Sequence, residues 1–233
     1  MPIPMLPADL RAAEAETLSA LQAALSPESS GRLTVEWRFE GLRLLPPVLR
    51  LLERLSEQGL NPWLLFSDAG GAALARRDAP ALAERILDFR QLQQRQQEQA
   101  SEGLLLAVTP SAADYEAFEE LCKGHRGAVV MVNGRLEDAA VGIGSVARER
   151  RRGFVATWSS AYALIPLDGG ALRHALPGGW ELYRLDADGY RQVASFEQKP
   201  DGETIGDALS GDEVGGVGST LRAVDALIEG LRS

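Results

Sequence analysis

Short apolar runs alternate with longer segments of mixed apolar and polar residues along the first 135 positions. Residues 33–39 alternate as a half-buried strand, and residues 63–66, 104–108 and 128–132 are almost wholly apolar, as in strands buried on both faces. The segments between them have helix length. This alternation predicts a layered α/β domain with a mixed, mainly parallel sheet and helices on both faces.

Apolar residues at helical spacing place the intervening helices. An opening helix is expected over residues 7–25, and another begins at Pro46-Pro47, where two prolines suit a first helical turn. A third is expected with Asp78 as its N-cap, and a fourth after Ser111 and Asp114, which resemble a capping box. The expected inner faces are Val48, Leu51, Leu52 and Leu55; Leu82, Ile86 and Phe89; and Tyr115, Phe118, Leu121 and Cys122.

The C-terminal third has a different pattern. Residues 162–167, 180–185 and 190–196 are strand-like, and the last two flank Asp186-Ala187-Asp188-Gly189, a hairpin signal. We therefore expect an antiparallel extension of the sheet. Residues 1–210 are predicted to form a single three-layer domain, with the glycine-rich segment and C-terminal helix of residues 211–233 packed on it.

Composition excludes several classes of protein. A net charge of −9 opposes general attraction to nucleic acid. Cys122 is the only cysteine and there are two histidines, so we expect neither a disulfide nor a metal site. No apolar run has the length of a membrane helix, and we expect neither a secretory signal nor a transit peptide before the first helix. Membrane contact, if any, is expected to be peripheral.

Two polar segments follow predicted strands, where α/β sheets bind ligands. The first contains Asp68, Gly70 and Gly71, and the second runs from Asn133 to Gly144 and Ser145. Backbone N–H groups at either helix start could hold a phosphate. Alternatively, Asp68 is an N-cap and the glycines only form turns. Neither segment contains a complete nucleotide-binding fingerprint, because no third glycine follows at the required spacing.

Four arginines follow the second segment. Arg148, Arg150, Arg151 and Arg152, against Glu149, give a local charge of +3. On a helix, Arg148, Arg151 and Arg152 share one face, whereas Arg150 falls on an apolar arc with Phe154 and Trp158. The arginine face either is solvated and pairs with the chain's own carboxylates, or it docks an anion or a protein partner.

Signals for catalysis are weak. His125 and His174 could each serve a serine triad, but neither lies near a nucleophile elbow, and His125 is expected in a solvated turn. Cys122 is expected to be a core residue rather than a reactive thiol. No catalytic set emerges, and no cofactor can be assigned.

Five motifs in order resemble the DUF1995 family, a domain of unknown function found in cyanobacteria and plastids. They are FSDAGGAALARRD at 66–78, VVMVNGRL at 129–136, GIGSVARERRRGF at 142–154, YALIPL at 162–167 and ALPGGWELY at 175–183. The resemblance extends from about residue 5 to residue 209. The residues that match the recurring pattern are Asp68, Asn133, Gly142, Gly144, Arg148, Arg151, Phe154, Pro177 and Trp180.

The resemblance implies an accessory protein rather than an enzyme, and it supplies no catalytic residues. Plant members include the low-photosystem-II-accumulation proteins, which resemble assembly factors, and a domain attached to a plastid adenylate kinase. We therefore expect a cyanobacterial protein, cytoplasmic or peripheral to the thylakoid membrane, that docks on photosystem or thylakoid-associated subunits through its arginine face. The alternative is a phosphorylated-metabolite or nucleotide binder, either a binding protein or an enzyme, with its site at the carboxyl ends of the strands.

Overall fold

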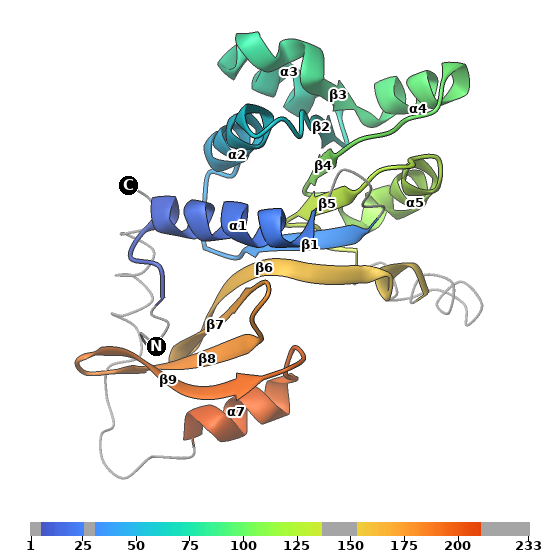
Figure 1. Ribbon diagram of the computed structural model, residues 1–233. Coiled ribbons are helices and arrows are strands. Elements are labelled where there is room, and N and C mark those ends of the chain that lie inside the picture. Colours follow the sequence, from blue (N-terminus) through green and yellow to red (C-terminus); the bar gives the residue numbers. More distant parts are fainter. Residues whose placement is uncertain (1–5, 26–30, 137–152, 211–233) are drawn as a thin grey trace. The chain divides into compact units, whose positions relative to one another are not determined.

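The computed structural model describes residues 6–25, 31–136 and 153–210 (Figure 1). Its strands form a nine-stranded mixed sheet in the order β3-β2-β4-β5-β1-β6-β7-β8-β9. This confirms the predicted α/β class with a mainly parallel part and an antiparallel C-terminal extension. None of the described helices is long and apolar enough to cross a membrane.

Contacts within the chain cluster into two compact units, which we describe separately. Of the described residues, unit 1 comprises 6–24, 36–43 and 161–210, and unit 2 comprises 25, 31–35, 44–136 and 153–160. The expectation of a single domain over residues 1–210 stays a prediction, and residues 211–233 lie outside the described part of the chain.

Unit 2 is built on parallel strands. The strands are β1 (Arg32–Trp37, whose last two residues belong to unit 1), β2 (Trp63–Phe66), β3 (Ile86–Asp88), β4 (Leu105–Val108) and β5 (Val129–Val132). The pairing aligns their ends, since Phe66 is the partner of Val108 and Val108 is the partner of Val132. Residues that follow different strands therefore meet at one edge of the sheet.

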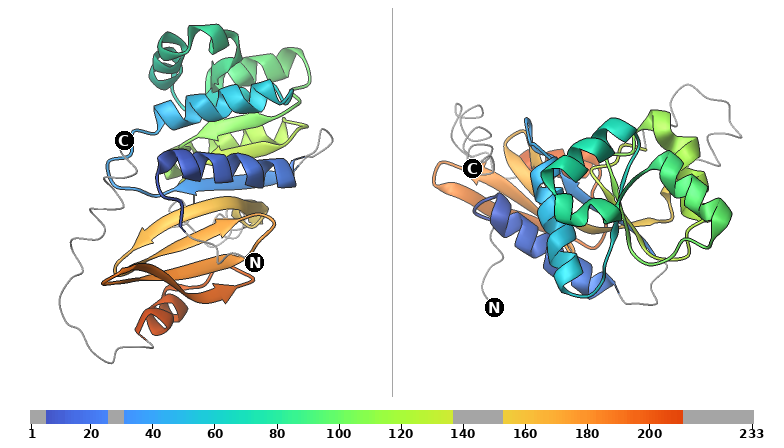
Figure 2. Two further views of the ribbon diagram at one scale, coloured as in Figure 1. Left: turned by 60° about the vertical axis from the view of Figure 1, so that its left-hand side comes forward. Right: turned by 90° about the horizontal axis from the view of Figure 1, so that it is seen from above.

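Helices cover both faces of this parallel sheet (Figure 2). They are α2 (Leu45–Glu57), α3 (Ala69–Asp78), η1 (Pro80–Arg85), α4 (Phe89–Glu98), η2 (Ala112–Asp114) and α5 (Tyr115–Lys123). Alternate strand residues such as Leu65, Leu105 and Val129 pack in one core cluster with Phe89 and Phe118, from α4 and α5. α2 and α3 lie on the opposite face, where Leu64, Leu106 and Val130 are fully buried.

Unit 1 has an antiparallel sheet, and each of its faces carries one of the helices that the structure describes. Its strands are β6 (Trp158–Leu167, which begins in unit 2), β7 (Gly170–Ala175), β8 (Trp180–Asp186) and β9 (Gly189–Phe196). The predicted hairpin is confirmed between β8 and β9. Helix α7 (Gly202–Ser210) packs through Ile205, Ala208 and Leu209 on a core that contains Leu172 and Leu182.

Helix α1 (Leu10–Ala24) covers the other face of the antiparallel sheet through a polar network. Glu16 accepts hydrogen bonds from Tyr162 Oη (3.2 Å) and Arg173 Nε (3.1 Å). Arg173 Nη1 also donates to Glu181 (2.6 Å), which accepts from Tyr183 Oη as well. Burial raises the pKa of Tyr162, and the nearby carboxylate of Glu16 raises it further. The hydroxyl therefore stays protonated and remains a donor. The network pairs partly buried charges and fixes how α1 lies on the strands.

Three sequence expectations for local structure are wrong. The single helix predicted after Asp78 is instead η1, strand β3 and helix α4, because Asp88 and Gln91 form a capping box that starts a new helix. Asp78 ends α3 and pairs with Arg77. Trp158 begins strand β6 and does not continue a helix, although it packs on Phe154 with ring centroids 5.8 Å apart.

Candidate functional site

The carboxyl edge of the parallel sheet, meaning the residues that end or follow β2, β3, β4 and β5, is the expected location of a ligand site. Two residues there adopt left-handed backbone, Thr109 with φ 48° after β4 and Asn133 with φ 51° after β5. They are held side by side because Thr109 N donates to Val132 O and Asn133 N donates to Val35 O, each at 2.8 Å. The β-branched Thr109 is strained in this region, which is typical of functional loops.

Asp68 is the N-cap of α3, as the alternative interpretation expected. Its Oδ1 accepts hydrogen bonds from Gly70 N (2.8 Å) and Gly71 N (2.9 Å). A Cβ on Gly70 would lie 2.9 Å from Asp68 Oδ1, and one on Gly71 would lie 3.3 Å from Asp68 Oδ2 and 3.0 Å from the Phe66 ring. The absence of these Cβ atoms lets the carboxylate approach the helix. The N–H groups that could hold a phosphate here already bind the chain's own carboxylate.

The other helix starts at this edge are satisfied in the same way. Asp88 Oδ1 accepts from Gln91 N (2.9 Å), at the beginning of α4. Asp114 Oδ2 accepts from Ser111 N (2.9 Å) and Ser111 Oγ (2.6 Å), which confirms the predicted capping box. Three carboxylates at the ends of three strands therefore act first as helix caps.

The second half of the predicted site falls mostly outside the described residues. Asn133 lies at the carboxyl edge, beside the loop after β4, because Arg135 N donates to Pro110 O at 2.9 Å. Gly142, Gly144 and Ser145 belong to residues 137–152, which the structure does not describe. The same holds for the whole arginine cluster, Arg148, Arg150, Arg151 and Arg152.

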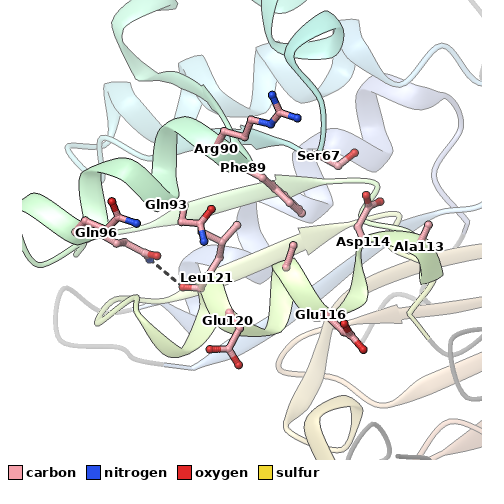
Figure 3. A pocket seen from close by; sticks show the side chains of 12 residues that line it. Ser67, Phe89, Arg90, Gln93, Gln96, Ala113, Asp114, Glu116, Glu120 and Leu121 are labelled. Atoms are coloured by element: carbon pink, nitrogen blue, oxygen red, sulfur yellow. Dashed lines mark hydrogen bonds between the residues drawn. The ribbon is translucent and has the colours of Figure 1, made fainter.

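A groove of about 670 Å³ opens between α4 and α5, beginning at the carboxyl edge (Figure 3). Ser67 after β2 and Asp114 after β4 line one end of it. These two strands are neighbours, but their following helices cover opposite faces of the sheet, which is the arrangement that forms ligand crevices in α/β folds. Sequence reasoning missed this groove, because its walls come from separate segments.

The charged side chains of the groove are more often acidic than basic. Among the described residues, Arg90 is the one cation of the lining, against Asp114, Glu116 and Glu120. The amides of Gln93, Gln96 and Gln97 also line the groove, and Gln96 Nε2 donates to Leu121 O (2.9 Å) across it (Figure 3). This lining suits neutral polar or cationic groups better than a phosphate.

His125 is buried, so the expectation of a solvated turn is wrong. Its Nδ1 lies 2.7 Å from Ser101 Oγ and its Nε2 lies 3.0 Å from Gly103 O. Since a carbonyl only accepts, Nε2 carries the proton and Nδ1 accepts from the serine. Burial lowers the pKa of His125 and keeps the ring neutral. The pair joins the loops before β4 and β5, where Ser101 and His125 form an isolated bridge.

Other reactive groups are either buried or committed. Cys122 is in the core, as predicted, and burial raises the pKa of its thiol to about 12. His174 stacks on Trp180 with ring centroids 4.7 Å apart, and its Nδ1 lies 3.0 Å from Gly179 O. Within the described part of the chain, no three His, Cys, Asp or Glu side chains gather as a metal site would require.

Comparison with known proteins identifies one family. The model of the domain of unknown function named DUF1995 matches residues 7–207, which is most of the chain. No curated protein matches it.

Proposed function

This chain belongs to the DUF1995 family, and we propose that it is a non-enzymatic accessory or assembly factor for a photosynthetic complex. Photosystem II biogenesis is the process that the resemblance to the low-photosystem-II-accumulation proteins suggests. The expected partners are photosystem or thylakoid-associated subunits. We expect the protein to bind them either from the cytoplasm or while peripheral to the thylakoid membrane.

The observation that carries the proposal is the state of the carboxyl edge. Asp68, Asp88 and Asp114 already bind backbone N–H groups at the helix starts where an α/β enzyme would bind phosphate. A phosphate entering there would have to displace a carboxylate and then face its charge. Polar groups at this edge thus stabilise helices instead of forming a phosphate site. This supports a protein that binds partners through its outer surface.

The proposed docking face consists of Arg148, Arg151 and Arg152, identified from the sequence. On a chain of net charge −9, a local charge of +3 steers the protein toward acidic surfaces. Arginine suits this role because its planar guanidinium binds carboxylates through two parallel hydrogen bonds. Such docking weakens with salt, which screens exposed charges.

Affinity purification of the tagged chain from its host cells tests the proposal. The wild type should recover photosystem subunits, and Arg148→Ala/Arg151→Ala should lose them. A matched control, Arg11→Ala/Arg43→Ala, removes the same charge at exposed arginines of unit 1 and should behave as the wild type. Equal recovery by all three proteins, at low and high salt, would contradict this docking face, and recovery by none would contradict the function.

A second candidate, a nucleotide or phosphorylated-metabolite binder, is supported by the location of the groove at the crevice between β2 and β4, whereas the acidic side chains of its lining oppose a phosphate. Its volume of about 670 Å³ lies within the range of small-molecule sites. Binding would raise the melting temperature by mass action, and Arg90→Gln would remove that rise. A panel of nucleotides and sugar phosphates without any shift would count against this candidate.

A further inference from the structure

Two arginines stack on one tryptophan at the amino ends of the parallel strands. Trp63 begins β2, Arg85 ends η1, and Arg95 lies in the last turn of α4. The guanidinium carbons of Arg85 and Arg95 lie 5.1 Å and 4.6 Å from the centroid of the Trp63 ring. We call these three residues the amino-edge patch. Both guanidiniums lie over the same ring, so a short peptide segment can span the two.

The guanidiniums of the patch retain most of their hydrogen-bonding capacity. Arg85 Nη1 donates to Asn61 O at 3.2 Å, and Arg95 stacks on the ring without a hydrogen bond to a described residue. Among the described residues, neither arginine forms an ion pair. Stacking holds the two planar groups in place before any ligand arrives, which reduces the entropy lost on binding.

A small pocket adjoins the patch. Its volume is about 200 Å³, and Trp63, Leu87, Leu92 and Arg95 form part of its wall. The remaining wall is the chain from Gln99 to Glu102. Small-molecule sites usually exceed about 300 Å³, so this pocket has room for one side chain rather than for a metabolite.

The patch places two positive charges beside a pocket with one carboxylate in its described lining, that of the exposed Glu102. Neither Arg85 nor Arg95 forms an ion pair with a described residue, so both can bind carboxylates of another molecule. Tryptophan and arginine are also among the residues that most often anchor protein interfaces.

We infer that the amino-edge patch docks an acidic segment of a partner protein, which places one apolar side chain in the pocket and carboxylates on Arg85 and Arg95. The inference deepens the proposed function and rests on it, since it names a second contact surface and the chemistry of the partner. Carboxylates suit the two guanidinium forks, and the net charge of −9 opposes nucleic acid as the occupant.

Fluorescence anisotropy with synthetic peptides tests this surface directly. The probe is labelled Glu-Asp-Leu-Glu-Asp with blocked ends, compared with a Gln-Asn-Leu-Gln-Asn peptide and with a Glu-Asp-Ser-Glu-Asp peptide. The acidic leucine peptide should bind best. Arg85→Gln/Arg95→Gln should weaken its Kd by about tenfold or more, the loss expected for one charge-assisted hydrogen bond. Trp63→Leu, which removes the stacking platform, should weaken binding as well.

Matched controls separate binding from folding and from general charge. Arg54→Gln/Arg77→Gln removes the same charge at exposed positions of unit 2 and should bind as the wild type. Urea melts should show that both arginine double variants remain folded under the binding conditions. Equal binding by the two double variants overturns the inference, as does tighter binding of inorganic pyrophosphate than of any peptide. Peptides that fail to bind, while photosystem subunits are still recovered from cells, overturn this inference and leave the proposed function standing.

Discussion

Charged side chains at the two edges of the parallel sheet are engaged in different ways. At the carboxyl edge, Asp68, Asp88 and Asp114 are bound to backbone N–H groups. At the amino edge, Arg85 and Arg95 are held by stacking on Trp63 and keep donors for another molecule. The residues placed best for an interaction thus lie opposite the edge where a ligand site is usually sought.

Helix dipoles account for both signs. Helices of a parallel sheet begin near the carboxyl edge, where the partial positive charge of the helix N-terminus favours acidic side chains. They end near the amino edge, where the partial negative charge of the helix C-terminus favours arginines. Acidic side chains at the carboxyl edge can reach the backbone N–H groups of the helix starts, and they bind there as caps. Arginine side chains are longer and extend past the helix end, so Arg95 reaches the ring of Trp63 instead.

The largest effect is expected from Gly127→Ala, at the amino edge. An added Cβ would lie 1.7 Å from the carbonyl oxygen of Gly103, so the two loops must separate. We expect a loss of about 3 kcal/mol or more in the free energy of unfolding, measured with urea. Gly31→Ala, before β1, meets no atom within 4 Å and should be nearly neutral. Similar midpoints for both variants would contradict the close packing of these loops.

A smaller loss is expected at the carboxyl edge from Asp88→Ala. Asp88 is buried and caps α4, so its removal leaves Gln91 N without its acceptor. The free energy of unfolding should fall by about 1–2 kcal/mol. Asp88→Asn retains an oxygen that can cap the helix, so it should keep most of the free energy of unfolding that Asp88→Ala loses. If Asp88→Ala unfolds at the same urea concentration as the wild type, the carboxylate is not structural, and the contrast between the edges weakens.

The pH dependence of stability should carry a contribution from His125. Its pKa in the folded state is lowered by burial, so the unfolded chain binds the proton more readily. This contribution is complete above the unfolded pKa of about 6.5 and is lost as pH falls through the lower folded pKa. His125→Gln should therefore show a flatter midpoint between about pH 7 and pH 5 in urea melts. Parallel curves for the two proteins would refute this.

The smallest effect is expected from the single variants Arg85→Gln and Arg95→Gln. Each arginine contributes a partly exposed cation–π contact, worth about 0.5–1 kcal/mol. Either single variant should therefore move the urea midpoint less than Asp88→Ala does. A large loss of stability would make these arginines structural and remove the difference between the two edges.

The sequence predicts the strands of unit 2 well, because contiguous apolar runs such as residues 104–108 suit a strand covered on both faces. Strand β3 was hidden, since Ile86 and Phe89 also fit the helical spacing of Leu82. The capping box of Asp88 and Gln91 was the local signal that could have separated them. Strand β7 and helix α7 were missed too, as neither has a long apolar run.

The candidate site is only partly accessible to sequence reasoning. Asp68 and Asn133 lie at the carboxyl edge as expected, because parallel strands end together. Trp63, Arg85 and Arg95 come from three different elements, so no spacing in the sequence reveals their contact. A half-exposed tryptophan at a strand start is the one local hint.

The burial of Cys122 has a practical consequence for locating partners. The only thiol of the chain has a pKa of about 12 and little access to solvent, so maleimide reagents near neutral pH should leave it unmodified. A single cysteine introduced at an exposed position, for example Gln99→Cys beside the amino-edge patch, would then carry a photo-crosslinker at one known place. Arg135→Cys would carry the crosslinker at the carboxyl edge. Because the native cysteine does not react, each crosslink would report the surroundings of one edge alone.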